Sequence, residues 1–333
     1  MRGSAGAMED KPSLSGGVHF YRVFGLGLRS AMLCPELPSA GRGEDVSIVL
    51  GPAPTDLTEP SMVVPGLQAG GDEFLLDIPE VARFHVANGN RIVVEPNREV
   101  EDPSIRLFLF GSAFGGLLYQ RGVVPFHAGA VEHGGGAVLF TGPSGAGKST
   151  AVGALSRMGK PILADDLCGV DIGEGGGPIL LPGIRLLKLS EDSILRIGGR
   201  AERLCWAGKG KRRYELAGEE SASADTFPLL GIYELVPEDR DDLALERLGG
   251  AEKMQTLLRN CYRPWFLEGM GHRKRHFEGV SLMARSSFVR RVRRPSVGFR
   301  LDELAELLAE DMAGEGVSSG AVHCQRRGTP PTG

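Results

Sequence analysis

Nine consecutive residues, from Gly142 to Thr150, combine the residue types that bind a phosphate chain. They match Gly-x-x-x-x-Gly-Lys-Ser, and they lie between an apolar segment (137–141) predicted as a strand and a segment (150–157) predicted as a helix. Glycines let the backbone turn tightly, so that successive N–H groups face the phosphates, and the positive start of the next helix adds to that field. Lys148 would reach the β- and γ-phosphates, and the Ser149 hydroxyl would bind Mg²⁺. The sequence therefore predicts that a nucleoside triphosphate binds to Gly142, Pro143, Ser144, Gly145, Ala146, Gly147, Lys148, Ser149 and Thr150.

Two adjacent carboxylates follow this loop. Asp165 and Asp166 come 17 and 18 residues after Lys148, at the end of the short apolar segment 161–166 that predicts the next strand. A carboxylate there can hold Mg²⁺ directly or through water, and a second one beside it can accept a proton from an attacking hydroxyl. Asp is also common where a strand ends in a turn. We expect at least one of the two to be functional, and the residues alone leave open which is the base.

A single histidine precedes the loop. His127 lies 15 residues before Gly142, in the apolar segment 123–131. A lone histidine among apolar residues is more often structural than catalytic, so its spacing by itself assigns it no role.

Together these features resemble the catalytic domain of HPr kinase/phosphorylase, a kinase family with a phosphoenolpyruvate-carboxykinase-like fold. The specific part of the resemblance covers about residues 119–190. In detail the chain is more similar to HPr-kinase-related proteins found with peptide-modification machinery, such as that of lasso peptide biosynthesis. The segments that carry this likeness are Gly25–Ser30, Tyr119–His127, Pro182–Leu189 and Leu258–Pro264.

The resemblance implies roles for the individual residues. Lys148 would stabilise the developing charge on the transferred phosphoryl group, and Ser149 would ligate Mg²⁺. Asp166 matches the proton acceptor for a substrate serine, and Asp165 would support the metal or its waters. His127 matches a catalytic histidine near the transferred group.

Two departures from the family pattern concern the phosphorylase reaction, in which inorganic phosphate removes the phosphoryl group from phosphoserine. Position 150 is Thr where the bifunctional enzymes usually carry Glu, and the segment that carries a later metal-binding Glu is replaced by 182–188, which contains no carboxylate. The resemblance therefore implies a kinase of another substrate, rather than a phosphorylase or a kinase of HPr.

Basic residues supply candidates for the remaining phosphate contacts. Arg259 and Arg263 are such candidates, as is the glycine-containing segment 209–214. A cation there could clamp the γ-phosphate or a phosphorylated product. We expect the basic clusters 272–276 and 290–294 to face solvent, as charge runs usually do. The alternative is that they bind an acidic peptide or partner.

Length and composition set outer limits. The chain has 333 residues, 41% of them hydrophobic and 24% charged, with a net charge of −4 and five scattered cysteines without a C-x-x-C pair. These values are ordinary for a globular protein, argue against nucleic acid as a partner and suit reduced thiols in a cytoplasm. No apolar stretch approaches the ~20 residues that cross a bilayer, and no apolar signal core begins the chain. We therefore expect a cytoplasmic protein without membrane contact.

The elements that must position these residues form two predicted domains. Short alternating segments separated by Gly, Pro and Asp predict a small, mostly β domain over 18–103. Apolar residues at helical spacing over 104–121 predict a helix that begins an α/β phosphate-loop domain of the HPr kinase type over 104–314, which ends in helices near 250–262 and 301–312. Residues 1–17 and 315–333 are predicted as disordered tails.

The predicted function is Mg²⁺- and ATP-dependent phosphorylation of a serine on a peptide or small protein. A kinase for a small-molecule hydroxyl is one alternative, because the same groups would serve it. A regulatory module that binds ATP without transfer is another, and the carboxylate pair distinguishes it, since a binder needs no base. Whether the chain forms a homo-oligomer is left open.

Overall fold

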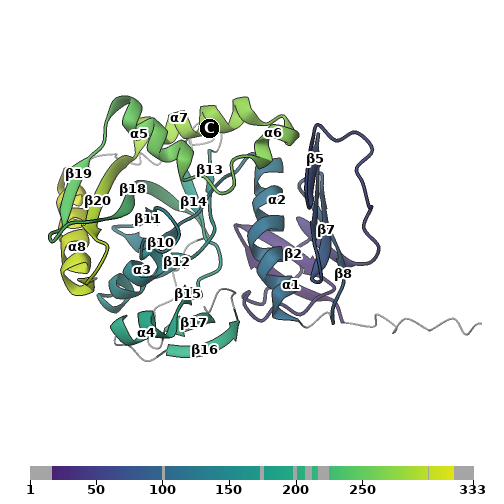
Figure 1. Ribbon diagram of the computed structural model, residues 1–333, viewed down its shortest axis with the longest axis horizontal. Coiled ribbons are helices and arrows are strands. Elements are labelled where there is room, and N and C mark those ends of the chain that lie inside the picture. The colour runs from purple at the N-terminus through teal and green to yellow at the C-terminus, as the bar shows by residue number, and fades with distance from the viewer. Residues whose placement is uncertain are drawn as a thin grey trace, which may run out of the picture. The chain divides into compact units, whose positions relative to one another are not determined.

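A computed structural model describes residues 17–99, 102–172, 176–197, 201–206, 212–216, 225–298 and 300–318. Its elements are labelled in Figure 1. Packing divides the chain into two compact units. The N-terminal unit comprises the residues up to Val123 together with Arg263–Phe277, and the C-terminal unit comprises Val124–Tyr262 and the residues from Glu278 onward.

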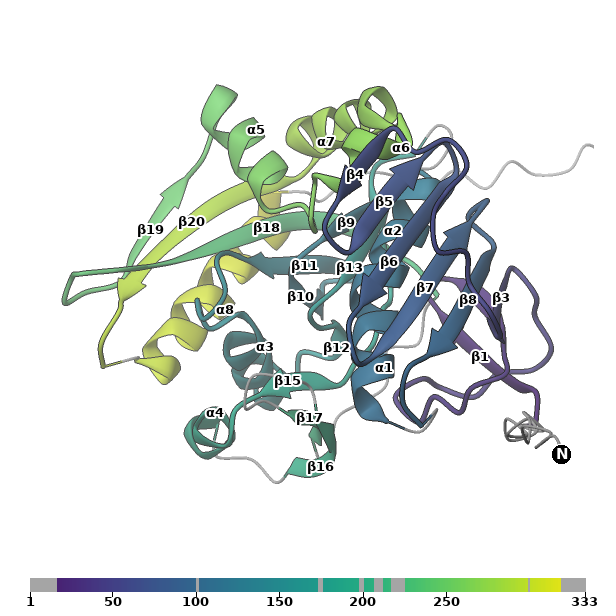
Figure 2. The same ribbon diagram turned by 45° about the vertical axis from the view of Figure 1, so that its right-hand side comes forward.

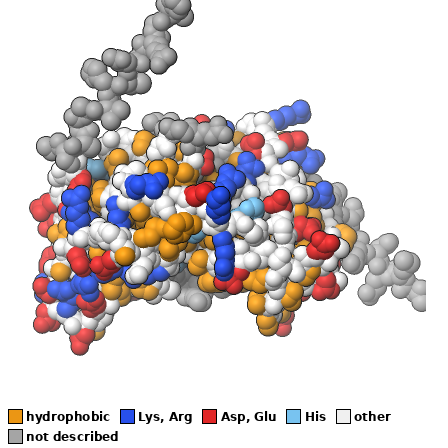
Figure 3. Space-filling model, turned by 90° about the horizontal axis from the view of Figure 1, so that it is seen from above, with side chains coloured by type: hydrophobic (Ala, Val, Ile, Leu, Met, Phe, Trp, Pro, Cys, Tyr) orange, Lys and Arg blue, Asp and Glu red, His pale blue; other side chains and the backbone are white. Residues whose placement is uncertain are grey.

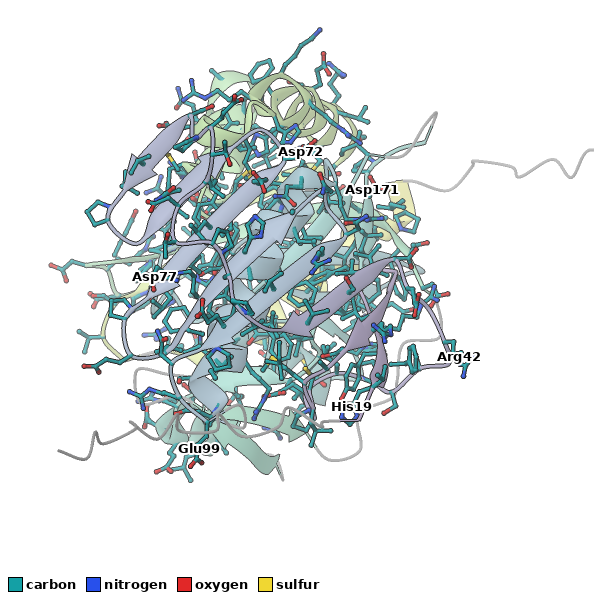
Figure 4. The ribbon with its side chains drawn as sticks, turned by 90° about the vertical axis from the view of Figure 1, so that its right-hand side faces the viewer. His19, Arg42, Asp72, Asp77, Glu99 and Asp171 are labelled. Atoms are coloured by element: carbon teal, nitrogen blue, oxygen red, sulfur yellow. The ribbon has the colours of Figure 1, made fainter. Side chains whose placement is uncertain are left out.

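An eight-stranded sheet forms most of the N-terminal unit and is seen in Figure 2 and, with its side chains, in Figure 4. Its strands are β1 (His19–Val23), β2 (Leu26–Ser30), β3 (Val46–Leu50), β4 (Met62–Val64), β5 (Leu67–Gly70), β6 (Glu73–Ile78), β7 (Ala82–Ala87) and β8 (Arg91–Pro96). They lie in the order β1-β2-β3-β8-β7-β6-β5-β4. The pairs β2–β3 and β3–β8 are parallel and the other pairs are antiparallel.

The helical run predicted over 104–121 packs on this sheet, which corrects its predicted place in the second domain. It comprises α1 (Pro103–Phe108), the π-helix η1 (Leu109–Ala113) and α2 (Phe114–Gln120), and it contacts β7. Asp102 begins it, because its carboxylate accepts the Ser104 N–H at 2.7 Å. Every residue of α2 is buried. A helix buried all round takes its place from tertiary contacts, and periodicity does not reveal which sheet supplies them.

Residues from the second half of the chain complete the N-terminal unit. Helix α6 (Phe266–Met270) contacts β4 and β5, and the Phe266 and Phe74 ring centroids are 4.5 Å apart. A Cβ at Gly269 would lie 2.5 Å from the Cβ of Ala69, so the close approach of α6 to β5 requires glycine. This long-range packing explains why a boundary drawn along the sequence differs from the division that the structure shows.

A nine-stranded mixed sheet forms the centre of the C-terminal unit. Its strands are β9 (Val124–Phe126), β10 (Gly129–His133), β11 (Gly136–Thr141), β12 (Ile162–Ala164), β13 (Cys168–Asp171), β14 (Ile179–Leu181), β18 (Phe227–Glu238), β19 (Ala244–Arg247) and β20 (Phe288–Pro295). Seven lie in the order β12-β10-β11-β18-β14-β13-β9, while β20 pairs with β18 and β19. Strands β11, β18 and β20 run parallel, so the loop after β11 lies at the edge where β18 and β20 also end.

Helices cover both faces of this sheet (Figure 1). They are α3 (Lys148–Arg157), α5 (Gly250–Arg259), α7 (Arg273–Ser286, whose first five residues belong to the N-terminal unit) and α8 (Leu301–Ser318). Helix α4 (Glu191–Ile197) packs against α3. Val138 and Phe140 of β11 pack in a core with residues of α3 and α8. The alternate residues Ala137 and Leu139 pack in a second core with residues of α5 and α7. A small sheet adds β15 (Leu187–Leu189), β16 (Ala201–Trp206) and β17 (Arg212–Leu216), in the order β15-β17-β16.

The ends of the chain only partly meet the sequence-based expectation. Helix α8 continues to Ser318, so the first residues of the tail predicted from 315 are helical. Residues 1–16 and 319–333 of the predicted tails lie outside the described residues. None of the described helices has both the length and the apolar character that crossing a bilayer requires.

Candidate active site

The segment Gly142–Gly147 forms the turn between β11 and α3. Gly142 has φ +133°, and a Cβ there would lie 2.3 Å from the Leu235 carbonyl oxygen. Gly147 has φ +93° and is the residue that precedes the first turn of α3. Side chains are disfavoured at both φ values, so the loop depends on glycine to bring its backbone close to β18 and to direct the first N–H groups of α3 outward.

Lys148 is the first residue of α3 and is buried. Its Nζ donates to the carbonyl oxygens of Gly142 at 3.0 Å and Pro143 at 3.1 Å. The ammonium thus lies inside the turn of the loop, where phosphate oxygens could replace these carbonyl acceptors.

Ser149 and Asp165 are joined directly. The Ser149 hydroxyl donates to Oδ1 of Asp165 at 2.9 Å, and the Lys188 backbone N–H donates to Oδ2 at 2.7 Å. Asp165 is 2% exposed, and burial raises its pKa to about 6, with the charge of Asp166 acting in the same direction and the two hydrogen bonds opposing it. A hydroxyl and a carboxylate are the hard oxygen ligands that Mg²⁺ prefers, so this pair fits a magnesium site.

Protein ligands alone do not complete such a site. Among the described residues, no three His, Cys, Asp or Glu side chains converge as a metal site would require. Mg²⁺ usually takes one or two protein oxygens and completes its shell with waters and substrate phosphates. The Ser149–Asp165 pair therefore suits a metal that arrives with a nucleotide.

Asp166 has a strained backbone and a cationic partner. Its φ is +73°, a region that side-chain-bearing residues rarely adopt. Oδ2 of its carboxylate lies 3.1 Å from Nζ of Lys188. Strain of this kind costs of order 1–3 kcal/mol and is concentrated at functional sites.

His127 lies on the other side of Asp166. Its Nδ1 is 3.0 Å from the Asp166 carbonyl oxygen and 3.7 Å from Oδ1 of the same residue. Because a carbonyl oxygen can only accept, Nδ1 carries the hydrogen, and Nε2 of the neutral ring presents a lone pair. Burial lowers the pKa of His127, and Lys148 lowers it further, although Asp166 opposes both. The imidazole is thus neutral at pH 7 and can accept a proton or a hydrogen bond at Nε2.

A buried carboxylate supports the backbone around His127. Glu234 of β18 accepts from Arg259 through both oxygens, at 2.8 and 2.5 Å, and from Asn260 Nδ2 at 2.9 Å. The Asn260 carbonyl in turn accepts the His127 N–H at 3.2 Å. Burial alone would raise the pKa of Glu234, but hydrogen bonds from Arg259, Asn260 and Arg291 together lower it. The end of α5 is thereby tied to the segment that carries the histidine.

The two arginines predicted as phosphate contacts lie in different units. Arg259 is held by Glu234 with its side chain 50% exposed. Arg263 belongs to the N-terminal unit, where its guanidinium lies 5.8 Å from the Phe266 ring centroid. The side chains of the third candidate segment, 209–214, lie outside the described residues.

The basic cluster 290–294 lies on β20. Neither the prediction that it faces solvent nor the alternative that it binds an acidic peptide fits its contacts there. Arg290 donates to Asp311 and Glu315, and Arg293 donates to Glu238 and Glu246. Arg291 and Arg294 are buried. Val289 and Val292 of this strand are buried as well. Because charged residues surround them in the sequence, no apolar pattern predicted the strand. On the face shown in Figure 3, basic and acidic side chains are likewise interspersed.

Sequence reasoning brought together Lys148, Ser149, Asp165, Asp166 and His127, and all five lie in one cluster of the C-terminal unit. It assigned no role to Lys188 or Glu234, and it named Arg294 only as part of the cluster 290–294. Lys188 belongs to the segment Pro182–Leu189 that carried part of the family likeness, and this was its only signal. Nothing local to Glu234 indicated a role, and nothing local to Arg294 indicated a contact with the phosphate loop.

Comparisons with known proteins add little to this geometry. No family model and no curated protein matches the chain. Among solved structures, the HPr(Ser) kinase/phosphatase from Coxiella burnetii aligns at 16% identity and a TM-score of 0.31, covering 59% of this chain and 94% of that chain. A likeness this weak carries no argument, so the functional assignment depends on the residues described above.

Proposed function

We propose that this protein is a kinase that transfers the γ-phosphoryl group of Mg²⁺-bound ATP to a serine hydroxyl on a peptide or small protein. The observation that carries the proposal is the arrangement around Asp166. Its carboxylate lies 3.1 Å from Nζ of Lys188 and 3.7 Å from Nδ1 of His127, on a residue with φ +73° that follows Asp165 of the Ser149–Asp165 pair. A nucleotide-binding module needs the loop but has no use for a strained, cation-paired carboxylate.

The phosphate loop would hold the nucleotide. The N–H groups of Gly147 and of the first turn of α3 supply donors to phosphate oxygens. Lys148 would exchange its bonds to the Gly142 and Pro143 carbonyls for the β- and γ-phosphates. Ser149 and Asp165 would hold Mg²⁺, which when bound neutralises charge on the phosphates.

Asp166 would accept the proton of the acceptor hydroxyl. As the hydroxyl oxygen forms its bond to the γ-phosphorus, the bond from that phosphorus to the β,γ-bridging oxygen breaks and ADP leaves. The hydroxyl proton passes to the Asp166 carboxylate. Lys188, 3.1 Å from that carboxylate, can stabilise the equatorial phosphoryl oxygens. His127, through Nδ1–H to the Asp166 carbonyl at 3.0 Å, would help to hold the base in position.

The choice of serine on a peptide is taken from the resemblance to HPr-kinase-related proteins. Arg259 suits an acidic or phosphorylated group at the rim of the site, because Glu234 fixes its orientation while half of its side chain remains exposed. Arg263 stays a prediction as a phosphate contact.

The test is transfer of phosphate from γ-labelled ATP to a library of serine-containing peptides, read by mass spectrometry. Lys148→Ala serves as the inactive control, and circular dichroism checks that it folds. We expect labelled phosphoserine only with the wild-type protein. Label on a small-molecule alcohol instead would identify a small-molecule kinase, and ATP binding without transfer to either class would identify a regulatory module.

A further inference from the structure

Arg294 reaches the phosphate loop from a strand two places away in the sheet. It lies near the end of β20, which pairs with β18, which pairs with β11. Its side chain is 5% exposed. Nε donates to the Ala146 carbonyl at 2.9 Å, Nη2 to the Gly145 carbonyl at 3.3 Å and Nη1 to the Pro295 carbonyl at 2.6 Å.

These contacts constrain the loop at the peptide units that matter for binding phosphate. In a trans peptide the C=O and the following N–H point in opposite directions. A bond from Arg294 to the Ala146 carbonyl therefore directs the Gly147 N–H to the opposite side, where the first turn of α3 begins. The Ala146 N–H is held separately by the Pro143 carbonyl at 3.1 Å.

The geometry of the guanidinium suits this task. A planar guanidinium presents its N–H donors to two successive carbonyls in a fixed plane and direction, whereas the ammonium of lysine is a single point of charge without such a plane. Among the described residues, the neighbouring Arg293 makes no such bond to the loop. It is one-third exposed and donates to the carboxylates of Glu238 and Glu246.

We propose that Arg294 is a positioning residue that holds the phosphate loop in the conformation that binds the β-phosphate. The inference rests on the proposed nucleotide binding, but it does not require that phosphoryl transfer occurs. It gives Arg294 a role that neither sequence-based interpretation of the cluster 290–294 contains.

The test compares Arg294→Lys and Arg294→Gln with the matched control Arg293→Gln. Calorimetry measures the affinity for ADP and for AMP, because only ADP has the β-phosphate that the loop would hold. NMR measures hydrogen exchange of the Ala146 and Ala151 amides without nucleotide, since both N–H groups are bonded within the loop and the first turn of α3. Thermal melting checks the fold.

We expect both Arg294 variants to lose about tenfold or more of the preference for ADP over AMP, and their Ala146 amide to exchange faster by a similar factor. The control should behave as the wild type in both measurements. Wild-type preference and wild-type exchange in Arg294→Gln would overturn the inference. If that variant does not fold, unchanged values in Arg294→Lys would overturn it equally. Should the Arg294 effects appear while no phosphate is transferred to any acceptor, the kinase proposal fails and this inference stands.

Discussion

The ammonium of Lys188 lies 3.1 Å from Oδ2 of Asp166, while the backbone N–H of the same lysine lies 2.7 Å from Oδ2 of Asp165. One residue of β15 thus contacts both adjacent carboxylates through different groups. The backbone contact and Ser149 hold Asp165 in a buried position, whereas Asp166 keeps a cationic partner next to His127. This difference in surroundings assigns metal support to Asp165 and proton acceptance to Asp166 in the proposed mechanism.

Replacing Asp166 should separate transfer from binding. Asp166→Asn keeps the shape of the side chain but cannot accept a proton at neutral pH, so we expect the single-turnover transfer rate to fall about 10²–10⁴-fold. ATP affinity should change little, because the loop backbone and Lys148 supply the phosphate contacts. Asp165→Asn should instead weaken the response to Mg²⁺ and recover in part at higher Mg²⁺.

Rapid-quench kinetics across a Mg²⁺ series, beside nucleotide binding, checks both variants. Asp171→Asn is the control, because Asp171 ends the strand β13 and its Oδ1 accepts the neighbouring N–H of Ile172 at 2.8 Å (Figure 4 labels Asp171). A wild-type rate in Asp166→Asn with an inactive Asp165→Asn would mean that the two roles are exchanged. If neither variant differs from the control, the carboxylates are structural.

Removing the cation beside Asp166 should slow phosphoryl transfer. The ammonium of Lys188 lies 3.1 Å from the Asp166 carboxylate and, in the proposed mechanism, stabilises charge on the transferred phosphoryl group. We expect Lys188→Met to lower the single-turnover transfer rate with little change in ATP affinity. Lys188→Arg keeps the charge and should retain more of the rate. A wild-type rate in Lys188→Met would exclude Lys188 from the reaction.

The reverse reaction should be absent. The bifunctional enzymes that the sequence resembles carry metal-supporting Glu residues at two places. In this sequence, position 150 is Thr and residues 182–188 contain no carboxylate. We expect no pyrophosphate when the phosphorylated product is incubated with the protein and inorganic phosphate. A nonspecific phosphatase, which should dephosphorylate the same product, shows that its phosphoserine is accessible. Steady pyrophosphate release by the wild-type protein would contradict this prediction.

His276 should contribute a loss of stability in mild acid, opposite in sign to the contribution of Asp165, whose raised pKa favours the folded state as the pH falls. The His276 side chain is buried with its ring centroid 5.7 Å from that of Tyr119, and burial lowers its pKa from 6.5 to about 4. Between these two values the unfolded chain takes up a proton that the folded chain does not, so the free energy of unfolding decreases as the pH falls through this window. The loss from this residue is about 3 kcal/mol at most, and most of it has occurred by pH 4.

Chemical denaturation from pH 7 to pH 4 measures this loss. His276→Gln removes the titrating group, so its stability should depend less steeply on pH over this window, whatever its stability at pH 7. His272→Gln is the matched control. His272 lies four residues earlier, and its ring is bonded to Asp72 at 3.2 Å, whereas Nε2 of His276 has no hydrogen-bond partner among the described residues. Equal slopes for the wild type and His276→Gln would refute the prediction.

The sequence by itself determined the features that depend on neighbouring residues. The glycines and Lys148 predicted the phosphate loop, and the apolar segments on either side predicted β11 and α3 in their observed places. The pair Asp165 and Asp166 was expected at the end of a strand, and β12 ends one residue before it. Each of these signals lies within a few residues of the structure that it predicts, so local backbone preferences and periodicity were sufficient.

Tertiary structure alone decided which distant residues complete the site and to which unit each segment belongs. Lys188 meets Asp166 across 22 residues, and Arg294 meets Ala146 across 148. The α2 helix and residues 263–277 join the N-terminal sheet through side-chain packing that the chain order does not show. These outcomes follow from the sum of many weak contacts between separate elements, whose register and pairing no local pattern contains. For that reason the loop could be predicted from the sequence, whereas the residues that hold it and its neighbouring carboxylates in position could not.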